Sequence, residues 1–100
     1  MKAEALARLA QTVVATDPDR AKELTARAEN VAQSTNNYNR ASGLARIARA
    51  IAATDPKRAE ELADRAERAT RSIADEDEMA FALLDLAQAA AAIILTGRYP

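Results

Sequence analysis

Apolar residues recur at spacings of three and four along the first third of the chain, which is the period of an α-helix with one buried face. Two such stripes follow one another, the first made of Leu6, Leu9, Ala10 and Val13 and the second of Ala21, Leu24, Ala28 and Val31. They predict one helix over about residues 2–16 and another over about residues 18–34. Charged residues lie between the stripes, as in helices that each bury one side.

The sequence Thr16-Asp17-Pro18 separates the two stripes. Proline disfavours helical conformation in the residue before it and fits the first position of a new helix. Aspartate is a good N-cap, so we expect the Asp17 carboxylate to accept a hydrogen bond from the backbone N–H of Arg20. A connection this short makes the two helices an antiparallel hairpin.

The same pattern returns 38 residues later, where Asp55 of Thr54-Asp55-Pro56 is expected to cap the N–H of Arg58. Residues 6–34 and 44–72 align without a gap and are identical at 16 of 29 positions. The second pair of stripes comprises Leu44, Ile47, Ala48 and Ile51, followed by Ala59, Leu62, Ala66 and Ala69. A repeat of this length is typical of stacked helical units, each of which needs a neighbour to bury its apolar face.

A third unit begins near Glu76. When one inserted residue is allowed, its Leu83, Leu86, Ala87 and Ala90 align with Leu44, Ile47, Ala48 and Ile51 of the second unit. It has no third Thr-Asp-Pro turn, and the helix continues to Gly97. We therefore predict an all-α fold, a short right-handed αα-solenoid of two and a half helix-hairpin repeats with five helices and a period of about 38. The single domain, residues 1–100, divides into repeats at 2–37 and 38–75 and a terminal half repeat at 76–97.

On the second helix of each hairpin, acids and bases stand three or four residues apart and are expected to form exposed ion pairs within one helix. These pairs are Arg20–Glu23, Glu23–Arg27, Glu61–Arg65, Asp64–Arg68 and Glu67–Arg71. The polar connectors at residues 35–37 and 74–77 supply Asn and Asp as N-caps for the helices that follow them.

The repeated unit L-A-x-[LI]-A-x-x-[VI]-x-A-T-D-P-x-R-A-x-E-L-x-x-R-A-E resembles degenerate α-hairpin repeats of large actinobacterial proteins, over residues 6–96. The resemblance implies a tetratricopeptide-like or HEAT-like solenoid that binds other proteins. A period of 38 and prolines inside the hairpin depart from tetratricopeptide repeats. Asp17 with Arg20, and Asp55 with Arg58, are similar to the Asp and Arg of HEAT repeats. A consensus-designed or recently duplicated protein would show the same near-identity of units.

The amino-acid composition limits the catalytic and metal-binding chemistry that the side chains can perform. The chain has 27 alanines, no cysteine and no histidine, and its net charge is −1. Without cysteine or histidine, a serine has no base to activate it, so we expect no enzyme and no cofactor. The best candidate metal ligands, Asp75-Glu76-Asp77-Glu78, lack the spacing of a calcium loop and are interpreted as acids at a helix N-terminus.

Membrane and nucleic-acid partners are also disfavoured by the sequence. The longest uncharged run, residues 86–97, is too short and too rich in alanine for a bilayer span. We therefore expect no membrane association and a cytoplasmic location. The near-neutral charge and the scarcity of aromatic residues argue against nucleic acid, and a HEAT-like nucleic-acid binder is kept as a minor alternative.

Three arginines form the candidate partner site. Arg8 and Arg46 occupy the same repeat position, and Arg49 follows Arg46 on the same helix. Residues 38–58 carry five basic residues against one acid. Because one helix layer of a solenoid lines its binding surface, we expect these arginines to hold an acidic protein or peptide. Asp85 interrupts the row of arginines in the third unit.

The last helix is more apolar than its equivalents. Phe81 and Leu84 stand where the second unit has Ser42 and Ala45. A terminal solenoid repeat normally has a polar outer face. We therefore expect an exposed patch that forms a two-fold homodimer or contacts a further repeat, and it consists of Phe81, Leu84, Ile94 and Leu95. The alternative is that this helix packs inward over the second hairpin and buries Phe81 or Leu84 within the chain.

Two function classes follow from these patterns. The first is a non-catalytic repeat scaffold that mediates protein–protein interaction and is an excerpt of a longer array. The alternative is a self-associating structural building block, natural or designed. The oligomeric state separates them, because a scaffold remains a monomer whereas a building block forms dimers or polymers.

Overall fold

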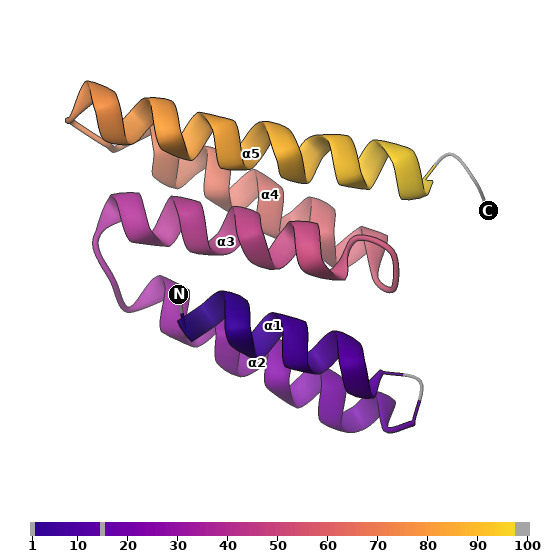
Figure 1. Ribbon diagram of the computed structural model, residues 1–100. Coiled ribbons are helices and arrows are strands. Elements are labelled where there is room, and N and C mark those ends of the chain that lie inside the picture. Colours follow the sequence, from indigo (N-terminus) through magenta and orange to yellow (C-terminus); the bar gives the residue numbers. More distant parts are fainter. Residues whose placement is uncertain (1, 15, 98–100) are drawn as a thin grey trace.

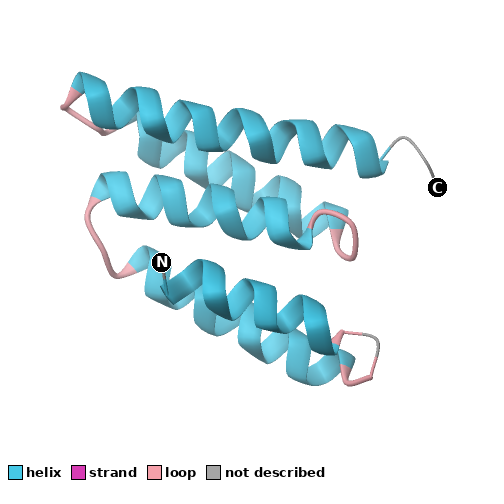
Figure 2. Ribbon diagram, in the orientation of Figure 1, coloured by secondary structure: helices cyan, strands magenta, loops and turns pink. Residues whose placement is uncertain are grey.

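The computed structural model describes residues 2–14 and 16–97, and this part of the chain forms five α-helices without a strand (Figure 1). The helices are α1 (Lys2–Val13), α2 (Pro18–Gln33), α3 (Asn37–Ile51), α4 (Pro56–Arg71) and α5 (Glu76–Gly97). Figure 2 shows that short loops join them. The predicted all-α fold and the predicted five helices are confirmed over the described residues.

The helices form two layers. α1, α3 and α5 run side by side in one direction, and α2 and α4 return behind them in the opposite direction (Figure 1). α1 packs against α2, and α3 packs against α4, as antiparallel hairpins. α3 also packs against α1, α2 and α5, while α5 packs against α3 and α4. The central helix α3 therefore holds both hairpins and the fifth helix together.

Both Thr-Asp-Pro turns form as the sequence predicts. The backbone N–H of Arg20 donates to Asp17 Oδ1 at 3.1 Å, and the N–H of Arg58 donates to Asp55 Oδ1 at 3.1 Å. Each aspartate thus satisfies one of the free N–H groups at the start of the second helix of its hairpin. Two further helices begin in the same way, α3 with Asn36 and α5 with Asp75.

The first helix is shorter than the apolar stripe indicates. It ends at Val13 and not near residue 16. The carbonyl of Val13 accepts hydrogen bonds from the N–H groups of Thr16 and Asp17, at 3.2 and 2.7 Å. These bonds close a tight turn that directs the chain back towards α2.

We expect Asp17→Ala and Asp55→Ala each to lower the free energy of unfolding by about 1 kcal/mol, because each leaves a helical N–H without its cap. The fold itself should persist, with an unchanged circular dichroism spectrum. Urea unfolding of the single and double variants measures the effect, and Glu60→Ala, at an exposed position within α4, is the control. Equal stability of the double variant and the parent chain would contradict the capping role.

Alanines and a few large aliphatic residues make up the main core, which surrounds α3. Leu44, Ile47 and Leu62 are fully buried in it. Their neighbours are small, so the helices approach closely; they include Ala28, Ala48, Ala59 and Ala66. Leu24 is buried in a separate cluster within the first hairpin. The predicted core positions of Leu24, Leu44 and Leu62 are confirmed.

Two predicted stripes are exposed in part. Leu9 is exposed although its equivalent Ile47 is buried, and Leu83 is exposed although its equivalent Leu44 is buried. Ala87 and Ala90 are exposed as well. α1 and α5 lie at the two edges of the front layer, so each has a neighbour on one side only (Figure 1). The sequence pattern identifies apolar faces, and the position in the stack decides which of them are covered.

Candidate interaction sites

The three arginines expected to bind a partner share one face of the front layer. Arg8 of α1 and Arg46 and Arg49 of α3 line one shallow depression of about 240 Å³. Arg49 Nη1 donates to Gln88 Oε1 of α5 at 2.9 Å. The depression itself spans α1 and α3, while the role of these arginines in binding stays a prediction.

Acidic groups from the neighbouring helices neutralise part of this face. Arg46 Nη1 lies 3.5 Å from Glu4 Oε1, and Arg46 Nε lies 3.6 Å from Asp85 Oδ2. Arg8 pairs with Glu4 along α1 at 3.0 Å. Arg46 is thus held between two carboxylates, and Arg8 and Arg49 are the more exposed cations of the three.

The fifth helix presents large apolar side chains to solvent. Phe81, Leu84, Ile94 and Leu95 are each more than half exposed. At about 100° per residue, Phe81, Leu84 and Leu95 fall on one side of α5, here called the outer edge, whereas Ile94 falls on the side of Leu83. The patch expected to self-associate is therefore exposed, and it divides into two parts.

By length and composition, α5 is also the one helix among the described residues that could cross a membrane, over Glu76–Thr96. That span includes all but the last residue of the uncharged run considered above, residues 86–97. In this structure Asp85, in the middle of α5, accepts a hydrogen bond from Ser42 Oγ at 2.6 Å and faces Arg46. Moving the helix into lipid would break these polar contacts and bury a carboxylate. The absence of a membrane partner stays a prediction.

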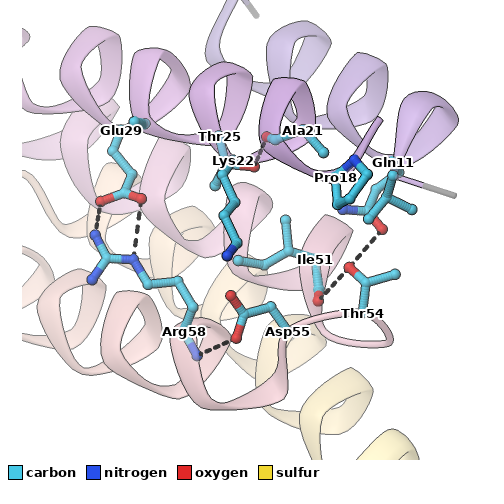
Figure 3. Close-up of a pocket in the computed structure, with 12 residues that line it drawn as sticks. Gln11, Pro18, Ala21, Lys22, Thr25, Glu29, Ile51, Thr54, Asp55 and Arg58 are labelled. Atoms are coloured by element: carbon cyan, nitrogen blue, oxygen red, sulfur yellow. Dashed lines mark hydrogen bonds and ion pairs between the residues drawn. The ribbon is translucent and has the colours of Figure 1, made fainter. Parts of the chain in front are cut away.

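An ion-pair cluster around one buried carboxylate joins the two hairpins (Figure 3). Glu29 of α2 is buried, and its carboxylate pairs with both Arg58 and Arg65 of α4. The distance from Arg65 Nη1 to Glu29 Oε1 is 3.2 Å, and Arg58 Nη1 also lies 2.7 Å from Glu61 Oε2. The hydrogen bond to Glu29 raises the pKa of Arg58 against the opposing effect of partial burial, and Glu61 raises it further. The cluster is the main polar link between α2 and α4.

This cluster corrects the prediction that Arg65 pairs with Glu61 along one helix. Arg65 contacts Glu29 of the other hairpin, because a buried carboxylate needs cationic partners more than an exposed one does. Of the other predicted pairs, Arg20–Glu23 and Glu67–Arg71 form at 3.1 and 3.6 Å. Within the described ranges, no ion pair forms for Glu23–Arg27 or Asp64–Arg68. The sequence contains a signal for this cluster, because both hairpins have its arginines and its glutamate at equivalent repeat positions.

A cavity of about 470 Å³ lies between the hairpins beside the cluster (Figure 3). Ala21 and Thr25 of α2 and Ile51 of α3 line it, together with the charged Lys22 and Asp55. No Cα of α2 comes within 8 Å of α4 in the described helices, so the two second-layer helices are separated. The cavity depends on this separation, which the periodicity of the sequence does not predict.

Within residues 2–14 and 16–97, no group of three or more acidic side chains is placed to hold a metal ion. In the acidic segment 75–78, Asp75 accepts a hydrogen bond from the N–H of Glu78 at 2.9 Å as the N-cap of α5.

No protein-family model, curated protein or solved structure matches this chain. Its fold places it in the all-α class, with two similar helical hairpins and a fifth helix.

Proposed function

We propose that this protein is a non-catalytic helical-repeat scaffold for protein–protein interaction, a right-handed αα-solenoid with a period of about 38 residues and part of a longer array. The equivalence of the two hairpins carries the proposal. Each has a Thr-Asp-Pro turn with an aspartate cap, and Leu24 and Leu62 are buried at the same repeat position. Units of this kind stack through neighbours and present one helix layer to a ligand.

The arginine face is the proposed binding site for an acidic protein or peptide in the cytoplasm. Support comes from the shared depression of Arg8, Arg46 and Arg49 and from the exposure of two of them. A carboxylate entering the depression would gain bidentate contacts with guanidinium groups. It would replace Glu4, which reaches Arg46 only at 3.5 Å.

Charge reversal at this face is expected to weaken binding of a fluorescent glutamate-rich peptide. The variant combines Arg8→Glu, Arg49→Glu and Arg46→Gln. Position 46 receives glutamine because a glutamate there would lie beside the carboxylate of Glu4. The parent chain should bind the peptide more weakly as salt rises, because rim charges act mainly through screened electrostatics. Fluorescence anisotropy at several salt concentrations measures both effects.

The control for this experiment carries two reversals on the other layer, Arg68→Glu and Arg71→Glu, both at exposed positions of α4. It should bind the peptide as the parent chain does, with equal helicity. Unchanged affinity of the arginine-face variant, or affinity that does not respond to salt, would remove the acidic partner from the proposal.

A second candidate function, self-association, is favoured by the exposed outer edge of α5. A two-fold dimer would bury Phe81, Leu84 and Leu95 against the same residues of a second copy. If the dimer forms, Leu84→Glu should return the chain to a monomer with its helicity retained. Light scattering at several concentrations measures this, and a parent chain that is a monomer at all of them would exclude self-association.

A further inference from the structure

The central helix α3 is covered on both sides, whereas α5, its equivalent in the third unit, is covered on one side. The alignment with one insertion sets residue 83 opposite residue 44. Leu44 is 1 % exposed, while Leu83 is 49 % exposed. Leu44 lies beside Arg65 and Ala69 of α4, and α3 packs along α4, so α4 covers this side of α3. The exposed side of α5 is thus equivalent to a surface that already receives a helix.

A groove of about 370 Å³ runs between α4 and α5 on this exposed side. Its lining includes Asp64, Glu67, Leu83, Leu86, Ala87 and Ala90. In the preceding unit the equivalent residues, on α2 and α3, are Ala26, Glu29, Leu44, Ile47, Ala48 and Ile51. Four of these six form the buried face of α3 under α4. The groove therefore reproduces a helix-binding surface, here called the open groove, without its helix.

The charges of the open groove fit a cationic helix. Glu67 is the equivalent of Glu29, which receives Arg58 and Arg65 from α4. The Glu29 side chain is 9 % exposed, whereas that of Glu67 is 54 % exposed and, among residues 2–14 and 16–97, pairs only with Arg71 of its own helix, at 3.6 Å. Asp64 adds a second carboxylate where the preceding unit has an alanine. The open groove thus combines an apolar floor with two acidic groups on one wall.

We propose that the open groove binds one amphipathic α-helix of the same kind as α4. Arg58 and Arg65 stand seven residues apart, about two helical turns, so their side chains leave α4 on the same side, with Leu62 between them. The ligand is a helix with a leucine stripe and two basic residues at this spacing. It lies antiparallel to α5, as α4 lies to α3. This inference rests on the proposed interaction function and names the ligand class of a second surface, separate from the arginine face.

A synthetic peptide of residues 54–73, labelled for fluorescence anisotropy, is the probe, and the full chain is the receptor. The α4 site is already filled within the chain, so the peptide is expected to occupy the open groove, one peptide per chain. Leu83→Glu should abolish binding, because it places a charge on the apolar floor. Leu84→Glu is the matched control, since the two adjacent leucines are exposed to similar extents and Leu84 lies on the outer edge.

Substitutions that remove or reverse charges, in the chain and in the peptide, test the acidic wall of the open groove. Glu67→Gln should weaken peptide binding by about tenfold or more, because it removes the carboxylate that is equivalent to Glu29, the partner of both arginines in the α4 site. Glu23→Gln, the same change at an exposed position of α2, should leave the affinity unaltered. A peptide carrying Arg58→Glu and Arg65→Glu should fail to bind the parent chain and should bind the Glu67→Arg variant.

Three peptide-binding results would overturn the proposal. They are the absence of peptide binding to the parent chain, equal binding by Leu83→Glu, and binding that Leu84→Glu abolishes, which would assign the surface to the outer edge. Co-sedimentation of the parent chain with phosphatidylcholine vesicles, abolished by Leu83→Glu, would assign the open groove to lipid and also overturn it. If the glutamate-rich peptide still binds the arginine face in these cases, the proposed scaffold function stands and only the open-groove proposal fails.

Discussion

Leu62→Ala is expected to lower the free energy of unfolding by about 3 kcal/mol, because it removes a large side chain from a core made mostly of alanine. Leu62 is fully buried between α4 and α3, and Leu44 and Ile47 share its cluster. Small neighbours cannot move far enough to fill the space, since each helix is already held by close packing. Urea unfolding followed by circular dichroism at 222 nm measures the loss.

The matched control is Leu84→Ala, at a leucine that is 57 % exposed. It should change stability by about 0.5 kcal/mol or less, as exposed substitutions usually do. Similar losses for the two variants would show that Leu62 is not part of the structural core, or that the outer edge of α5 is buried in solution by association. Repeating the measurement at several protein concentrations separates these two explanations.

Glu29→Gln is expected to lower the free energy of unfolding by about 2 kcal/mol, because it removes the charge that Arg58 and Arg65 share. The loss is smaller than for a fully buried pair, since both arginine side chains are about one third exposed and water can replace part of the interaction. The variant tests whether the ion-pair cluster holds the hairpins together. Chemical unfolding and the separation of the two hairpins in solution scattering are the measurements.

Glu67→Gln is the repeat-equivalent control for this prediction. It makes the same chemical change at an exposed glutamate whose partner is Arg71 on its own helix, where ion pairs contribute little. Its effect on stability should be within about 0.5 kcal/mol. Equal losses at positions 29 and 67 would contradict the assignment of the cluster as the link between hairpins.

The local elements of this fold follow directly from the sequence. The spacing of Leu44, Ile47 and Ile51 marks the buried side of α3, and proline with aspartate marks the start of α2 and α4. These features depend on residues within one helical turn of each other, so periodicity and capping rules are sufficient to predict them. The end of α1 is the exception, because the tight turn after Val13 replaces its last helical residues.

The candidate sites depend on neighbours that a single helix does not determine. Leu9 and Leu83 belong to regular apolar stripes, yet both are exposed because α1 and α5 lie at the edges of the layer. Helical spacing predicts that Arg65 pairs with Glu61, whereas the buried Glu29 attracts it across the hairpins. Glu29 and Glu67 occupy equivalent positions of the two repeats, so the signal for the cluster and the open groove lies between the repeats and not within one helix.

The separation of α2 from α4 has a mechanical consequence. The front layer is joined by packed side chains along α3, while the rear layer is joined by Glu29 with its two arginines beside a cavity. Bending that opens the rear layer therefore strains a few ion pairs, and bending that opens the front layer must break apolar packing. The molecule is consequently stiffer in one direction than in the other. High salt, which weakens partly exposed charges, should soften the rear joint and leave the front layer rigid.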